Sequence, residues 1–188
     1  PAVREVCDRH GILLIADEVI TGFGRTGAWS GSRLWGVQPD MMCIAKAITS
    51  GYFPLGAALI NERIATAFES DSSGKAAIGH GYTYSGHPVG AAAALAAIAE
   101  TKRLDVVANA AVRGGHGLMT AMELVADRET KAPIDGKLAI KMQKAAYQAG
   151  ALIRVSGPNV ILSPSLVIEQ ADIDTALNAV EEGLKAIS

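Results

Sequence analysis

The 188-residue chain has few cysteines, few aromatic residues and few charges. It contains two cysteines, 5% aromatic residues and 19% charged residues, and its formal net charge is -2. Two cysteines, Cys7 and Cys43, form no disulfide framework, and we expect both to be free thiols in a reducing compartment. Basic residues form no cluster, so nothing indicates binding to nucleic acid or to an anionic membrane. The expected partners are small molecules and protein.

Long apolar runs are also missing. The longest run of small residues, Gly90 to Ala99, is too short and too rich in alanine to cross a bilayer. No basic segment with an apolar core opens the chain. We therefore expect a cytoplasmic protein without a membrane partner. The first residue is Pro1 rather than Met, directly before an apparent helix, and we expect a partial chain.

Hydrophobic residues make up 49% of the chain, enough for a substantial core. In the first hundred residues, short apolar runs at 12–16, 41–45 and 57–60 predict buried strands. Helical patterns lie between these runs, and an alanine-rich helix is predicted from His87 or Pro88 to about Lys102. This alternation predicts an α/β fold with a mostly parallel sheet.

The remaining residues have a different pattern. A strand at 118–125, a helix at 137–149, a hairpin at 151–163 and an amphipathic helix at 170–187 indicate a small α+β unit. We therefore expect two domains, with residues 1–105 in a large domain and residues 106–188 in a small C-terminal domain.

Acidic and basic side chains follow two of the predicted strands. Asp17 and Glu18 come after the strand at 12–16, and Lys46 comes after the strand at 41–45. Carboxyl ends of parallel strands form the ligand crevice of α/β sheets. A buried lysine has a lowered pKa, so its amine is neutral and can form a Schiff base with a carbonyl ligand. An aspartate can keep the nitrogen of a ligand's pyridine ring cationic. The same spacing also fits a structural ion pair, and spacing alone does not decide between them.

Three segments decide in favour of a ligand site. LLIADEVITGFGRTG (13–27), PDMMCIAKAITSGYFPLGA (39–57) and HGYTYSGHP (80–88) together resemble the class III aminotransferases, in the same order and at matching spacing. The resemblance implies the C-terminal part of a fold type I transferase. It also implies pyridoxal 5'-phosphate as the cofactor.

The resemblance assigns roles to particular residues. Lys46 corresponds to the Schiff-base lysine, Asp17 to the aspartate on the pyridine nitrogen, and Val19 to the residue on the ring face. Thr83 resembles the threonine that binds the cofactor phosphate from the neighbouring subunit, with Tyr82 beside it. The implied assembly is a homodimer with shared active sites. From its residue type alone, Thr83 also fits an ordinary strand threonine.

A fourth segment, LIRVSGPNVILSPSLVI (152–168), resembles the amine or ω-amino acid:pyruvate type. The resemblance places Arg154 at the position of the arginine that binds the substrate carboxylate. A guanidinium suits this role, since it can hold a carboxylate bidentately. The alternative for Arg154 is a solvated surface arginine. The implied activity is amino transfer from an amine or ω-amino acid to an α-keto acid such as pyruvate. The alternatives are another class III reaction, of the ornithine, 4-aminobutyrate or semialdehyde aminomutase type, and a catalytically silent dimerisation module.

Two departures from the family stand out. We expect the N-terminal half of the family's chain to be absent here. Between the alanine-rich helix and residues 113–118, the chain has only residues 101–112, where the family carries a further helical segment. The histidines and Cys43 lack the paired short intervals of a zinc site, so no metal is expected.

Overall fold

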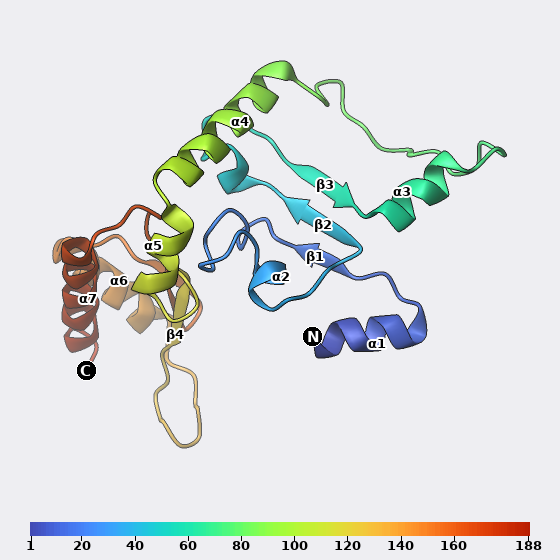
Figure 1. Cartoon of the computed structure of the whole chain (residues 1–188). Coiled ribbons are helices and arrows are strands. Elements are labelled where there is room, and N and C mark those ends of the chain that lie inside the picture. Colours follow the sequence, from blue (N-terminus) through green and yellow to red (C-terminus); the bar gives the residue numbers. More distant parts are fainter. The chain divides into compact units, whose positions relative to one another are not determined.

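The computed structural model describes all 188 residues, which form two compact units, Pro1–Ala108 and Asn109–Ser188 (Figure 1). Each unit combines helices with a three-stranded sheet, in agreement with the α/β class expected from the sequence. None of the helices is both long enough and apolar enough to cross a membrane.

The first unit alternates helices and strands along the chain. Its elements are α1 (Ala2–His10), β1 (Ile15–Asp17), α2 (Gly31–Leu34), β2 (Met41–Ile44), the 3-10 helix η1 (Lys46–Ile48), β3 (Ala57–Ile60), α3 (Glu62–Glu69), α4 (Pro88–Arg103) and the start of α5 (Val106–Arg113). The short segment expected at 101–112 is thus largely helical.

The ends of three helices follow from single residues. Gly11 ends α1 in the left-handed conformation, with a φ of 65°. The Asn61 side chain accepts a hydrogen bond from the Ile64 N–H (3.1 Å) at the start of α3, and His87 Nδ1 accepts one from the Val89 N–H (3.2 Å) at the start of α4. The start of the alanine-rich helix, predicted at His87 or Pro88, is confirmed.

The sheet of the first unit has the order β1-β2-β3. β1 and β2 are parallel, with Asp17 opposite Cys43, whereas β2 and β3 are antiparallel, with Ile44 opposite Ala57. The sheet expected to be mostly parallel is therefore mixed within this chain. The connection from β2 to β3 contains a single turn of 3-10 helix, and it lacks the crossover helix that usually returns a chain to start a parallel strand.

The faces of this sheet are largely open. Every residue of β3 is exposed, and so are Ile15 and Asp17 in β1. Continuous apolar runs of this kind are typical of strands buried on both faces. The prediction of buried strands is wrong for this chain, because the side chains of the first unit do not cover the sheet.

Asp40, directly before β2, joins several elements of the first unit. Its carboxylate is buried and accepts hydrogen bonds from the Leu14 N–H (2.8 Å), Arg4 (2.7 Å), Asn61 (3.1 Å) and Arg63 (3.1 Å). Its N–H donates to the Leu14 carbonyl, and its own carbonyl accepts from the Asn61 N–H, both at 2.9 Å. The hydrogen bonds from Leu14 and Arg4 lower the pKa of the Asp40 carboxyl to about 2.

The second unit is the predicted small α+β arrangement. Its strands form an antiparallel sheet in the order β4-β6-β5, and β5 and β6 make a hairpin. Its elements are β4 (Thr120–Glu123), α6 (Gly136–Gln148), β5 (Arg154–Ser156), β6 (Asn159–Leu162) and α7 (Gln170–Lys185). Helices α6 and α7 pack closely, since a Cβ on Gly183 would lie 2.9 Å from Met142. Met142 and Val160 are fully buried in the core beneath them.

We predict that Asp40→Asn weakens the fold at neutral pH and makes its acid dependence shallower. The pKa of this carboxyl is about 2 in the folded state and about 3.9 when unfolded, so its stabilisation is present above the higher value and is lost as the pH falls through this window. Thermal unfolding of the full-length protein at a series of pH values checks this. The midpoint of the variant should fall by several degrees at neutral pH.

The matched control is Asp174→Asn, which changes an exposed carboxylate on α7. It should keep the wild-type dependence on pH. Equal slopes for Asp40→Asn and the wild type in acid would contradict the assignment.

Candidate active site

The ends of the two parallel strands bring Asp17 and Lys46 to one edge of the sheet. Asp17 is the last residue of β1 and lies opposite Cys43 in β2, and Lys46 begins η1 three residues further on. Carboxyl ends of parallel strands share one edge, where α/β sheets bind their ligands. Both side chains therefore start at the ligand edge, and their roles there stay a prediction.

Lys46 combines an unusual backbone with a free side chain. Its φ of 47° lies in the left-handed region, which costs a non-glycine residue about 1 kcal/mol. Its side chain is exposed, and no hydrogen bond or ion pair engages its amine. The expected burial of this lysine is wrong for the chain, because β2 is itself only half-buried. The amine is accessible to a ligand.

Asp17 and Val19 form a short turn at the end of β1. Oδ1 of Asp17 accepts a hydrogen bond from the Val19 N–H (3.1 Å), which orients the carboxylate. The Asp17 side chain is exposed, and its second oxygen, Oδ2, has no partner. An exposed carboxylate oxygen without a partner can accept a hydrogen bond from a protonated ligand atom.

Glu18, between these two residues, points inward and anchors the following loop. It is 3% exposed, and its carboxylate accepts hydrogen bonds from the N–H groups of Gly31 (2.8 Å) and Ser32 (2.7 Å) and from the hydroxyls of Thr21 and Ser32. Burial raises the pKa of the Glu18 carboxyl, but the hydrogen bonds from Ser32, Thr21 and Gly31 outweigh burial and the net pKa is lowered.

The sequence offers a weak signal for this inward position. Ser30-Gly31-Ser32 begins α2 and supplies the N–H and hydroxyl donors that a buried acid needs. Glu18 thus belongs to the scaffold behind the turn, although sequence reasoning places it with Asp17 at the strand end.

Tyr82 and Thr83 lie in the exposed loop between α3 and α4. The N–H of Tyr82 donates to the Ser85 hydroxyl (3.0 Å), its carbonyl accepts from the Ser85 N–H (2.9 Å), and its ring lies edge-on to His80 at 5.1 Å. Thr83 is exposed and has no side-chain partner. No interaction joins either residue to Asp17 or Lys46.

The end of this loop is fixed to the segment that follows Lys46. The His87 ring lies 5.3 Å from the ring of Phe53, and a Cβ on Gly90 would lie 3.0 Å from the same ring. His87 accepts its hydrogen bond from the first turn of α4.

Arg154 belongs to the second unit. It is the first residue of β5, lies opposite Ile161 in β6 and is exposed. Its guanidinium has no hydrogen bond or ion pair, so it is free to bind an anion.

A family model described as aminotransferase class-III matches residues 1–114, which is more than half of the chain. The chain belongs to this family. The match confirms the prediction made from the three motifs in the first hundred residues.

The fold of this class III chain is that of a solved transaminase. An amine transaminase from an uncultivated Pseudomonas species, described in its PLP-bound (internal aldimine) form, matches with a TM-score of 0.95 and 44% identity. The match covers 100% of this chain and 48% of that chain. It confirms the expected fold class, and the cofactor of that structure is the one expected from the sequence.

Two curated relatives come from Pseudomonas aeruginosa. A putrescine–pyruvate aminotransferase is 38% identical over 196 residues, which cover 93% of this chain and 42% of the relative. A β-alanine–pyruvate aminotransferase is 36% identical over 204 residues, which cover 99% of this chain and 46% of the relative. The chain spans less than half the length of either.

The second alignment also shows a difference in length. It runs over 204 positions, whereas 99% of the 188 residues is about 186, so this relative carries about 18 residues without a counterpart in the chain.

We predict that Glu18→Ala destabilises the full-length protein by at least about 2 kcal/mol, because it leaves buried N–H and hydroxyl donors without an acceptor. Denaturant unfolding measures this loss. Glu69→Ala, at the exposed end of α3, is the control and should change stability by less than about 0.5 kcal/mol. Similar stabilities for the two variants would rule out an anchoring role for Glu18.

Proposed function

We propose that the whole protein is a pyridoxal-phosphate-dependent aminotransferase that moves an amino group from an amine or ω-amino acid to an α-keto acid such as pyruvate. One observation carries this proposal. The two relatives at 38% and 36% identity are both named for pyruvate, and the solved neighbour at 44% identity is named for an amine. The expected cytoplasmic location belongs to the same proposal.

The residues at the ligand edge suit this cofactor. When bound, pyridoxal phosphate supplies an electron sink for the substrate carbon. The free Lys46 Nζ would bind the cofactor covalently and later move the proton of the substrate carbon. The unpartnered Oδ2 of Asp17 would keep the pyridine nitrogen protonated, and half-buried Val19 would cover one face of the ring.

Tyr82 and Thr83 suit a shared site. Both are exposed, and neither contacts the ligand edge of its own chain. We propose that they bind the cofactor phosphate of a partner subunit, which makes the active protein a homodimer. A threonine hydroxyl and N–H groups beside glycine are apt donors for a phosphate.

We also propose that residues 1–105 are the C-terminal part of the large cofactor-binding domain and that residues 106–188 are the small domain. Arg154 would bind the carboxylate of the keto acid. Its exposed and unpaired guanidinium allows this role.

Lys46→Ala should lower amino transfer in the full-length protein by at least about 10²-fold, because it removes the group that moves the proton. The variant should also lose the visible absorbance that depends on a lysine-bound cofactor. Lys144→Ala, on the exposed surface of α6, is the control and should keep both rate and spectrum. If Lys46→Ala has the wild-type spectrum and rate, Lys46 is not the cofactor lysine.

The donor is identified by a screen with pyruvate as acceptor. Putrescine, β-alanine, 1-phenylethylamine, ornithine and 4-aminobutyrate are tested with the full-length protein, and alanine formation is measured. We expect alanine from β-alanine, putrescine or 1-phenylethylamine. Alanine from ornithine alone, or from none, would overturn the proposed substrate class.

Arg154→Ala should raise the KM for pyruvate by about 10-fold or more and spare an amine donor without a carboxylate, since a charged hydrogen bond contributes about 1.5–3 kcal/mol. Steady-state kinetics with pyruvate and 1-phenylethylamine separate the two effects. Arg128→Ala, in an exposed loop of the same unit, serves as the control. Equal losses for both substrates would leave Arg154 without a role in carboxylate binding.

A further inference from the structure

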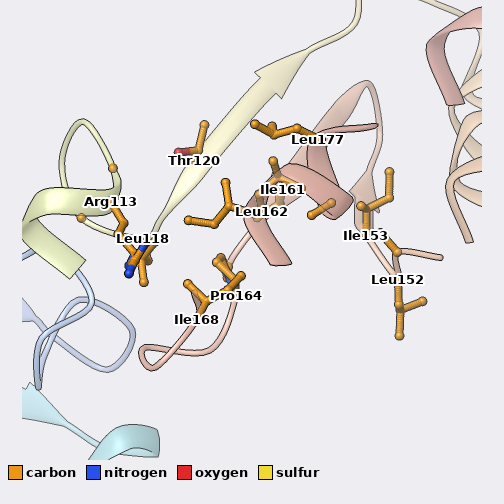
Figure 2. Close-up of a pocket in the computed structure, with 16 residues that line it drawn as sticks. Arg113, Leu118, Thr120, Leu152, Ile153, Ile161, Leu162, Pro164, Ile168 and Leu177 are labelled. Atoms are coloured by element: carbon orange, nitrogen blue, oxygen red, sulfur yellow. The ribbon is translucent and has the colours of Figure 1, made fainter. Parts of the chain in front are cut away.

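The second unit contains a cavity that the proposed active site does not use. Its volume is about 300 Å³, and its walls come from the end of α5, the start of β4, the segment before β5, the end of β6 and α7 (Figure 2). The lining is mainly aliphatic and includes Leu118, Ile153, Leu162, Ile168 and Leu177. None of the residues proposed to bind the cofactor or the substrate lines it.

The size and lining of the cavity suit an apolar ring system. A cavity of about 150 Å³ lined by aliphatic and aromatic residues stays dry and binds benzene. This cavity is about twice as large, so it has room for two fused rings. Part of its apolar wall is open to solvent, since Leu152 is 81% exposed and Leu177 is 52% exposed.

The lining of the cavity contains one cationic residue, Arg113, at one end. Figure 2 shows Arg113 on the side opposite Leu152 and Ile153. Arg113 Nε donates a hydrogen bond to Asn109 Oδ1 (2.7 Å), and no hydrogen bond or ion pair engages its two terminal nitrogens.

Asn109 is itself held in place. Its amide nitrogen donates to the carbonyls of Leu166 (2.7 Å) and Ile168 (3.3 Å), in the loop that follows the β5–β6 hairpin. The amide is thereby fixed with its oxygen toward Arg113, one helical turn further along α5. The guanidinium is oriented in advance, and its two terminal nitrogens remain available as a fork for a carboxylate.

We propose that this cavity binds a small aryl carboxylate of about two fused rings, with the rings against Ile153, Leu162 and Leu177 and the carboxylate on the terminal nitrogens of Arg113. The cavity shares no residue with the proposed cofactor site, and the proposal does not rest on the proposed function. It combines an apolar wall with a single charged group, the usual composition of small-molecule sites.

Calorimetric titration of the full-length protein with 2-naphthoate, and with the neutral 2-naphthamide, tests the proposal. We expect 2-naphthoate to bind the wild type more tightly than 2-naphthamide. Arg113→Gln should weaken naphthoate binding by about 10-fold or more and naphthamide binding by less than about twofold.

A second variant keeps the test independent of Arg113. Ala176 lines the cavity from α7, so the larger side chain of Ala176→Leu should occupy the cavity and abolish binding of both compounds. Ala171→Leu, at an exposed position of the same helix, is the control and should leave the binding of both compounds unchanged. Amino transfer should be the same in both variants, so a failure here is distinct from a failure of the proposed function.

Three results would overturn the proposal. Absence of binding to the wild type would show that the cavity does not take an aryl carboxylate. Binding that survives Ala176→Leu would place the ligand elsewhere. Equal affinities for naphthoate and naphthamide, unchanged in Arg113→Gln, would exclude carboxylate recognition.

Discussion

The first unit depends on one buried carboxylate, that of Asp40. Hydrogen bonds to it arrive from α1 through Arg4, from the approach to β1 through Leu14, and from the start of α3 through Asn61 and Arg63. The backbone of the same residue bonds to Leu14 and Asn61. A carboxylate held by several donors fixes the relative positions of the segments that supply them. This group aligns the start of β1, the start of β2 and the end of β3. It thereby also fixes the relative position of the carboxyl ends of β1 and β2, where the ligand edge lies.

The sequence predicts the elements well where one residue decides a boundary. Gly11 ends α1 through its left-handed backbone conformation. Asn61 and His87 begin α3 and α4 by accepting a hydrogen bond from an N–H group of the first turn. The sequence fails on the sheet. Apolar runs at 12–16 and 57–60 predict buried strands, yet burial depends on what covers the strand, and nothing in the runs themselves says whether a cover is present. The antiparallel pairing of β3 likewise depends on the length and content of a loop.

The same distinction holds at the candidate site. The positions of Asp17 and Lys46 at the strand ends follow from two short apolar runs and a parallel register. The inward orientation of Glu18 does not, because it requires donors from residues thirteen and fourteen positions away. The setting of Arg113 does not follow either, since it depends on Asn109 and on two carbonyls more than fifty residues along the chain. Local chemistry is readable from the sequence, whereas contacts between distant segments are not.

The exposed strand β3 has a consequence for any polypeptide limited to these residues. It pairs with β2 on one side only, and all four of its residues are exposed. An apolar strand with unpaired N–H and C=O groups is a template on which another strand can add. Such a polypeptide would associate edge to edge as its concentration rises, and in a cell it would engage chaperones and proteases. A strand added at this edge would satisfy the unpaired N–H and C=O groups and remove the template for association.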